Sequence, residues 1–308
     1  MLNRTHHKMK KQFIIFVILT CSFYSCSFGQ KNDSLFSRLQ AISNSGTDFF
    51  NVDGIEITSQ KINSEFTKNN ILKNFKKYSI KENDLNANDS SIENQNYYIS
   101  KSEDIEPGTI QRTSYYFIEN KSKGITAITF AYLNKTDKAF EREFVALILN
   151  DEIPKSIYTS LEIDSINFAG RKIALGKSCR WMGINNLQCP YYGQMNWSVH
   201  KNLEDASQSV TNQYNLIKAK RGGKIISEEL VDVIFEGTDV KVKKVVYDFK
   251  GVKSLLVGMS GGKTLTIYFV VSPVRKNYVS CVMSFWNNDN INQSGLPPLL
   301  EEVMKLKK

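Results

Sequence analysis

The stretch from residue 202 to 308 alternates apolar runs with glycine-containing turns, and this spacing constrains the fold more than any other feature. Runs rich in β-branched and aromatic residues predict five strands, at residues 231–235, 240–247, 252–259, 264–271 and 278–286. The turns between them recur at intervals typical of an antiparallel meander. Such a sheet has to bury an apolar face, so neighbouring segments must supply elements that cover it.

Two helices are predicted around these strands. Asn202 is expected to be an N-cap, with Asp205 three residues later, and apolar residues then recur at helical spacing at Leu203, Ala206, Val210, Tyr214 and Ile217. A closing helix is expected to begin near Pro297 and to carry Leu296, Leu299, Leu300, Val303 and Leu306 on one face. The predicted class is therefore α+β, with an antiparallel sheet covered by helices.

The first half of the chain is predicted to follow a similar plan, so we divide the protein into domains at residues 30–161 and 162–308. Its predicted elements are strands at 54–62, 115–118 and 125–133 and helices at 64–78 and 140–149. Residues 130–134 also match residues 283–287 in character, at an offset of 153. Tandem duplication and chance similarity both remain open on this evidence.

Residues 81–108 are rich in Asn, Asp, Ser and Glu and contain few large apolar side chains. We predict a polar loop over this range, or several weak strands.

The order of elements in residues 162–308 resembles PsbP-like domains, which are α-β-α sandwiches found in many exported binding and assembly proteins. The resemblance covers about half of the chain and depends on element order, without a shared residue motif. It implies a fold, and two such domains in tandem if the first half repeats the plan, but it transfers no site.

Residues 1–29 have the form of an export signal. Lys8, Lys10 and Lys11 precede an apolar run at residues 13–19, and small residues lie before a cleavage point after Gly29. The run is shorter than the roughly 20 residues that a membrane-spanning helix needs, and no later segment approaches that length. The expected location is the periplasm or the exterior.

Processing at Cys26 is the alternative, and it would leave the protein anchored by a lipid in the cell envelope. The residues before Cys26 fit that pattern poorly, since only Ser25 is small.

Removing the signal changes the chemistry that the chain offers. Residues 1–29 hold four basic residues and no acidic one, so the formal net charge falls from +9 to +5. Three histidines become one, and five cysteines become three. The remaining charge forms no long basic block, so we expect no nucleic-acid partner, and we expect no cofactor.

Most of the remaining reactive residues lie between Cys179 and His200, a segment that also contains Cys189. A Cys179–Cys189 disulfide is possible in an exported protein, and free buried thiols are the alternative. A zinc site from the three residues is disfavoured, because the spacings of ten and eleven residues lack a close ligand pair. A third alternative is a nucleophilic Cys189 with His200 as its base.

Residues 194–200 alternate between apolar and polar side chains, as in a half-buried strand. The apolar set is Met195, Trp197 and Val199, which we expect to pack under the helices. The polar set, with two tyrosines before it, forms a predicted contact surface of Tyr191, Tyr192, Gln194, Asn196 and His200. Amides beside aromatic rings suit a glycan or a peptide, although an ordinary half-exposed strand has the same pattern.

The residues after the signal contain no H-E-x-x-H motif, and we predict no enzyme mechanism. We expect an exported bacterial binding or envelope-assembly module whose partner is an envelope protein, a peptide or a glycan. The alternative is a thiol-dependent or other hydrolase built around Cys189 and His200.

Overall fold

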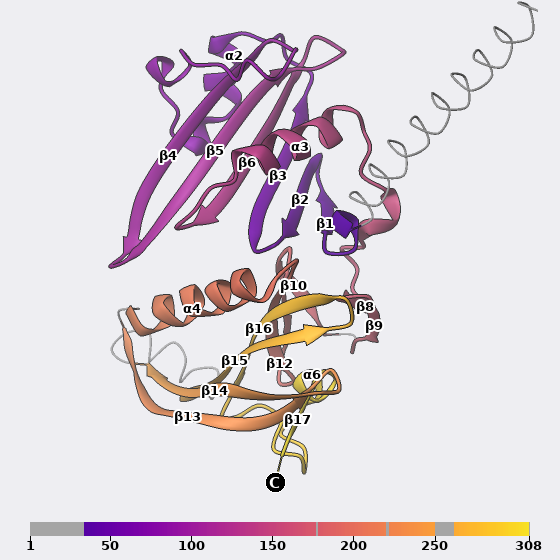
Figure 1. The fold of residues 1–308 in the computed structure, drawn as a ribbon, viewed down its shortest axis with the longest axis vertical. Coiled ribbons are helices and arrows are strands. Elements are labelled where there is room, and N and C mark those ends of the chain that lie inside the picture. The colour runs from indigo at the N-terminus through magenta and orange to yellow at the C-terminus, as the bar shows by residue number, and fades with distance from the viewer. Residues whose placement is uncertain (1–33, 177, 220–221, 250–261, 308) are drawn as a thin grey trace, which may run out of the picture. The chain divides into compact units, whose positions relative to one another are not determined.

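The computed structural model describes residues 34–307, apart from residues 177, 220–221 and 250–261. The chain divides into two compact units, Met1–Ser37 and Arg38–Lys308. Both large sheets belong to the second unit; the N-terminal sheet is mostly indigo to magenta and the C-terminal sheet is pink to yellow in Figure 1. The predicted signal, Cys26 and the predicted strand at residues 252–259 lie outside the described residues.

The N-terminal sheet has seven strands in the order β4-β5-β6-β3-β2-β1-β7. They are β1 (Gln40–Asn44), β2 (Thr47–Val52), β3 (Ile55–Ile62), β4 (Asn96–Glu106), β5 (Thr109–Glu119), β6 (Ile125–Leu133) and β7 (Tyr158–Thr159). All neighbours pair antiparallel except β1 and β7, which are parallel.

Two helices and three 3-10 turns accompany this sheet: α2 (Lys68–Asn74), η1 (Lys76–Tyr78), η2 (Glu82–Asp84), α3 (Lys138–Leu149) and η3 (Lys155–Ile157). Helix α3 begins where the Asp137 carboxylate accepts a hydrogen bond from the Phe140 amide, at 3.0 Å. Phe144 of α3 packs edge-on against Phe50 and Phe130 of the sheet. Helix α2 packs with a separate apolar cluster that includes Ile71, Phe117 and Ala127.

The C-terminal sheet has eight strands in the order β10-β11-β12-β16-β15-β14-β13-β17. They are β10 (Arg180–Gly183), β11 (Asn186–Cys189), β12 (Gly193–His200), β13 (Gly223–Phe235), β14 (Thr238–Phe249), β15 (Thr264–Val274), β16 (Asn277–Trp286) and β17 (Met304–Leu306). A separate hairpin of β8 (Ser165–Phe168) and β9 (Arg171–Ala174) and the helices α4 (Leu203–Ala219) and α6 (Pro298–Glu301) complete this half.

The two faces of the C-terminal sheet are covered differently. The larger core joins Met195, Trp197 and Val199 of β12 to Phe168 of the β8–β9 hairpin and Leu300 of α6. On the other face, α4 packs over a smaller cluster formed by β14 and β15 (Figure 1). The expectation that the apolar side of β12 packs under helices is therefore only partly correct, because much of its cover is a β-hairpin.

The two sheets repeat one topology. Three antiparallel strands, a helix, further antiparallel strands and a closing helix occur as β1-β2-β3-α2-β4-β5-β6-α3 and again as β10-β11-β12-α4-β13-β14-β15-β16-α6, where β13 is an additional strand. In each half the third strand of the first triplet pairs antiparallel with the last strand before the closing helix.

The two predicted matching segments, residues 130–134 and 283–287, both lie at the end of equivalent strands. The main-chain amide of Asn134 donates a hydrogen bond to the Ile110 carbonyl at 2.8 Å, and its side-chain Oδ1 accepts one from the Ile110 main-chain amide at 2.9 Å. Asn287 does the same with Thr264, at 3.1 and 3.0 Å. An asparagine therefore joins the open end of the strand pair β5–β6 in one half and of β15–β16 in the other, and the two asparagines are 153 residues apart.

Several predicted elements need correction. The protein is mostly β-sheet with few helices, so α+β holds in a broad sense, but helices do not cover the sheets throughout. The predicted loop at 81–108 contains η2 and all of β4, whose polar side chains are tolerated because β4 is an edge strand. The closing helix ends at Glu301, after which residues 304–306 pair with β13 as β17.

Candidate functional site

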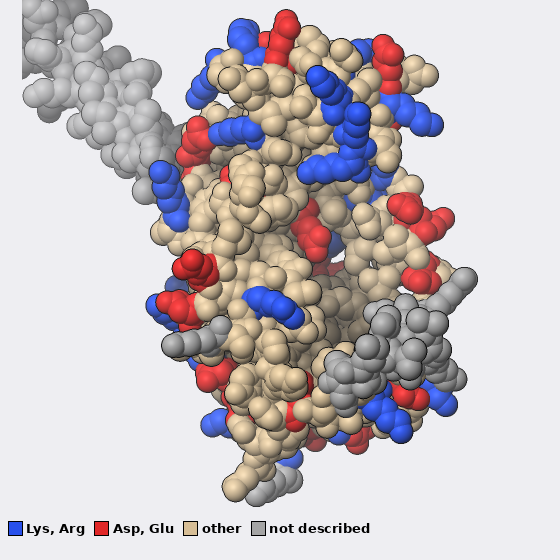
Figure 2. Space-filling model, turned by 180° about the vertical axis from the view of Figure 1, so that it is seen from behind, with Lys and Arg blue, Asp and Glu red and all other residues tan. Residues whose placement is uncertain are grey.

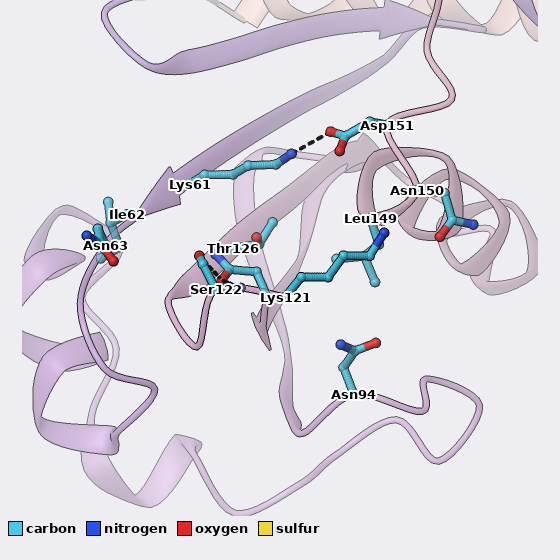
Figure 3. Close-up of a pocket in the computed structure, with 11 residues that line it drawn as sticks. Lys61, Ile62, Asn63, Asn94, Lys121, Ser122, Thr126, Leu149, Asn150 and Asp151 are labelled. Atoms are coloured by element: carbon cyan, nitrogen blue, oxygen red, sulfur yellow. Dashed lines mark hydrogen bonds and ion pairs between the residues drawn. The ribbon is translucent and has the colours of Figure 1, made fainter.

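Two pockets lie beside the C-terminal end of α3, and we call them together the α3 trough. They have volumes of about 390 and 450 Å³, and Lys61 and Asp151 line both of them. Lys61 Nζ donates to Asp151 Oδ1 at 2.6 Å, and the two side chains point toward one another in Figure 3. Volumes of this size are typical of sites for small ligands.

The first pocket, here the amide pocket, is lined mainly by polar side chains. Its lining is Lys61, Ile62, Asn63, Asn94, Asn120, Lys121, Ser122, Thr126, Leu149, Asn150 and Asp151. Four of these are asparagines, each of which has both a donor and an acceptor. Such a lining can form paired hydrogen bonds with a hydroxylated ligand.

The turn from β5 to β6 shapes one wall of the amide pocket. Asn120 Oδ1 accepts hydrogen bonds from the Ser122 amide, the Ser122 hydroxyl and the Gly124 amide, at 3.1, 2.8 and 2.9 Å. Lys123 adopts a left-handed conformation, with φ at 64°. The turn is thereby fixed by its own side chain, and it leaves Lys121 and Ser122 exposed at the pocket.

The end of α3 forms the opposite wall. Asp151 has φ at 55°, and the Glu152 amide donates to the Leu147 carbonyl at 2.9 Å, which closes the helix. The hydrogen bond from Lys61 lowers the pKa of Asp151, and the nearby charge of Lys121 adds to this effect. Asp151 therefore stays ionised in neutral solution, as the partner of Lys61.

Thr126 contributes a buried hydroxyl to the amide pocket. Its side chain is fully buried, and its Oγ1 has no hydrogen-bond partner among the described residues. Burying a hydroxyl without a partner costs roughly 1–3 kcal/mol. The Oγ1 atom is closed to solvent, so a polar ligand would become its partner only by displacing the atoms that cover it.

The second pocket, here the apolar pocket, has an apolar floor and a polar rim. Phe50, Leu147 and Ile148 are each more than nine-tenths buried, and Ile153 and Tyr158 complete the apolar lining. The rim is formed by Ser43, Asp48, Lys61, Asp151 and Lys155. Burial raises the pKa of Tyr158, whose hydroxyl donates to Asp48 at 3.4 Å.

The repeated topology explains why the trough is open. The sheet pairing sets Ile57 opposite Phe130 in one half and Met195 opposite Met283 in the other, at the matching offset of 153. Every second residue of a strand lies on the same face of the sheet. Starting from Ile57 and Met195, Ser59 and Lys61 of β3 therefore correspond to Trp197 and Val199 of β12. Small or charged residues thus stand where the other half has large apolar ones.

The same comparison applies to Thr126. It lies opposite Lys61, and its counterpart Val279 lies opposite Val199. Val279 is fully buried in the C-terminal core. The pocket therefore replaces two core valines by a lysine and a threonine.

The predicted contact surface is only partly exposed. Tyr191 is 58% exposed and has φ at 66°, an unusual conformation for an aromatic residue. Gln194 donates to Asn186 Oδ1 at 2.9 Å, and Asn196 is half-buried. Tyr191 and Gln194 border a hollow of only about 40 Å³, whereas Tyr192 lines a pocket of about 260 Å³.

The prediction for His200 is wrong, because its side chain is fully buried. Its Nε2 lies 2.8 Å from Ser280 Oγ, and Ser280 in turn contacts Ser209 of α4, which covers this face of β12. Burial lowers the pKa of His200 to about 4, so the ring is neutral in ordinary buffers. It belongs to the packing between strand and helix.

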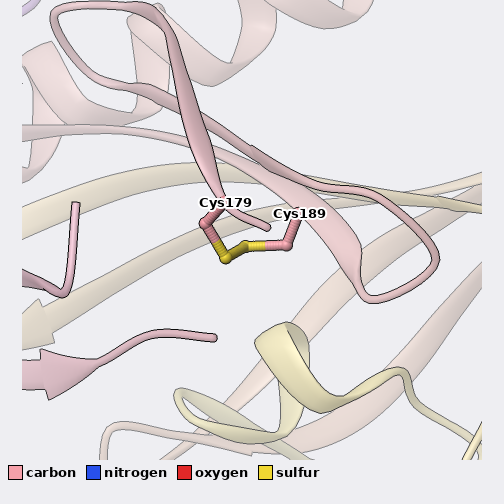
Figure 4. Close-up of a disulfide and its surroundings, with 2 residues drawn as sticks. All are labelled: Cys179 and Cys189. Atoms are coloured by element: carbon pink, nitrogen blue, oxygen red, sulfur yellow. A yellow bond between two sulfur atoms is a disulfide. The ribbon is translucent and has the colours of Figure 1, made fainter. Parts of the chain in front are cut away.

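Cys179 and Cys189 form a disulfide that ties the start of β10 to the end of β11 (Figure 4). Cys189 in this bond has no thiolate, so the proposed nucleophile with His200 as its base is excluded for the oxidised protein. Cys281 is a free thiol in the core, as expected, and burial raises its pKa.

Within the described part of the chain, no three His, Cys, Asp or Glu side chains are grouped so that they could hold a metal ion. The described helices also include none with the length and apolar character needed to cross a membrane.

Comparison with known proteins identifies no family. No protein-family model matches the chain, and no curated protein matches it. One solved structure, the di-domain aromatase/cyclase StfQ from the steffimycin biosynthetic pathway, is 12% identical over 86% of this chain and 77% of that chain. The TM-score is 0.16, which is too low to indicate a shared fold.

Proposed function

We propose that the protein is an exported binding module, built from two PsbP-like domains in tandem, and that it binds a hydroxylated ligand of glycan type in the amide pocket. The observation that carries this proposal is the buried Thr126 hydroxyl, which has no protein partner among the described residues and lines a pocket rich in amides. Its counterpart in the other half is a valine.

The charge pattern supports an uncharged ligand. The amide pocket contains Lys61 and Lys121, but Asp151 pairs with the first and the α3 carboxyl end adds partial negative charge. Acidic and basic side chains are interspersed over the face in Figure 2, with broad areas of other residues between them.

The disulfide supports export, because such bonds persist in oxidising compartments outside the cytosol. This fits the predicted signal at residues 1–29 and a periplasmic, secreted or lipid-anchored protein. The mass of the mature N-terminus would distinguish cleavage after Gly29 from lipidation at Cys26.

The test of the ligand class is a panel of methyl glycosides of glucose, galactose, mannose and N-acetylglucosamine, measured by saturation-transfer NMR and titration. We expect at least one to bind, and Thr126→Val to weaken it about tenfold, since one hydrogen bond to the ligand is lost. Thr211→Val on exposed α4 is the matched control and should leave affinity unchanged.

Two results would count against the amide pocket. Failure of all four glycosides to bind would contradict the glycan class. Binding that Tyr191→Gly abolishes and Thr126→Val leaves intact would move the site to the tyrosine turn at residues 191–192. If no glycoside binds, an envelope-assembly role becomes the better proposal.

A further inference from the structure

The amide pocket and the apolar pocket share two lining residues, Lys61 and Asp151, which form an ion pair. Lys61 is 51% exposed and Asp151 is 74% exposed. An ion pair this exposed contributes only about 0–1 kcal/mol, so its side chains can move aside at little cost. A ligand longer than one pocket can therefore lie across both.

The apolar pocket has the chemistry of a site for hydrocarbon. Phe50, Leu147 and Ile148 provide a floor without free polar groups, and the Tyr158 hydroxyl already donates to Asp48. A hydrocarbon chain gains from burial on such a floor and needs no hydrogen-bond partner.

An extended peptide fits this pocket less well, because it would need a free strand edge to pair with. The edge of β1 beside the pocket is occupied by β7, with Ala41 and Ile42 paired to Tyr158 and Thr159. Main-chain groups of a peptide would therefore lack partners where an alkyl chain does not need them.

We propose that the natural ligand is an amphiphile, with a hydroxylated headgroup in the amide pocket and a short hydrocarbon chain in the apolar pocket, joined across Lys61 and Asp151. The inference rests on the proposed function, because the headgroup is the glycan assigned to the amide pocket. The inference adds a hydrocarbon chain to the ligand and assigns that chain to the apolar pocket.

The test is a series of n-alkyl β-glucosides from methyl to octyl, titrated below their micelle concentrations. We expect the affinity to rise roughly two- to fourfold per methylene until the pocket is full, the larger value corresponding to complete burial. Ile153→Ser, in the lining of the apolar pocket, should reduce this dependence of affinity on chain length.

Leu230→Ser is the matched control. Leu230 is 64% exposed on β13 and far in sequence from the trough, so the same apolar-to-polar change there should leave the chain-length dependence intact. Thr126→Val should weaken every member of the series by a similar factor, because all share the headgroup.

Three outcomes separate the two proposals. Methyl glucoside binding with no gain from longer chains would overturn the amphiphile and leave the glycan site standing. A chain-length dependence that Ile153→Ser does not alter would show adsorption elsewhere and would also overturn the amphiphile. Failure of every glycoside and every alkyl glucoside would overturn the proposed function together with this inference.

Discussion

The two halves of this protein share a six-strand order, β4-β5-β6-β3-β2-β1 and β14-β15-β16-β12-β11-β10, but use the space beneath the closing helix differently. In the C-terminal half, Met195, Trp197 and Val199 fill that space, and the closing helix α6 is a single short turn. In the N-terminal half, the equivalent strand offers Ser59 and Lys61, and the closing helix α3 is 12 residues long. The comparison shows that one arrangement of strands can have a filled core or an open pocket, depending on a few side chains that face the closing helix.

The largest effect is expected from emptying the packed half. Trp197→Ala should reduce the free energy of unfolding by about 3–5 kcal/mol, because it leaves a large cavity in the core. The matched change Ser59→Ala should cost less than about 1 kcal/mol, since it removes one small hydroxyl. Urea denaturation, monitored by hydrogen exchange in each half, measures the loss of stability in both variants. Equal losses from Trp197→Ala and Ser59→Ala would contradict the comparison.

The second effect concerns the buried imidazole of the C-terminal half. The pKa of His200 is about 4 in the folded state and 6.5 in the reference state, so the unfolded chain binds the proton first as pH falls. The stability linked to the neutral ring is present above pH 6.5 and is lost toward pH 4, by roughly 3 kcal/mol. His200→Gln should remove this part of the pH dependence, measured as the difference in urea midpoints from the parent protein; identical pH profiles would contradict the assignment.

The third effect tests the disulfide, for which the described N-terminal half has no counterpart. Replacing Cys179 and Cys189 together by serine should cost about 3 kcal/mol, the chain-entropy value for a loop of ten residues. Hydrogen exchange should increase in β10 and β11 and stay unchanged in β1 and β2. Loss of protection in both halves would mean that the bond stabilises more than its own hairpin.

The smallest effect comes from exchanging one residue between the halves. Val279→Thr should cost about 1–3 kcal/mol, because it buries a hydroxyl among apolar neighbours. Thr126→Val should be neutral or stabilise by about 1 kcal/mol without ligand, because the buried hydroxyl has no protein partner among the described residues. Thermal unfolding in ligand-free buffer measures the stability of both variants. A large loss of stability in Thr126→Val would indicate that the Thr126 hydroxyl stabilises the fold itself.

Much of the fold was predictable from local patterns. The strand at residues 125–133 is confirmed as β6, and the Asn202 cap is confirmed by a 2.8 Å hydrogen bond from the Asp205 amide. These features depend on alternation and capping, which are properties of neighbouring residues. The short strands β10 and β11 were missed, because four residues carry too little alternation to be recognised.

The candidate site was not predicted, although the sequence held a signal for it. In the strand at residues 54–62, the apolar alternation of Ile55 and Ile57 changes to Ser59 and Lys61. That change is visible in the sequence, but its meaning depends on Thr126 and the end of α3, which only the fold brings alongside. The predicted His200 shows the converse, because a polar residue in an alternating strand was assigned to the solvent side although α4 covers it.

The sequence by itself therefore determined several of the longer strands and the turns between them, because hydrophobic periodicity and turn residues act over short distances. The tertiary structure decided which face of each strand is filled, which is covered and which is open. That choice depends on contacts between residues far apart in the chain, such as Lys61 with Asp151 and His200 with Ser280. Whether a face is filled, covered or open depends on packing volume and on the pairing of buried polar groups. Both are known only once the chain has folded.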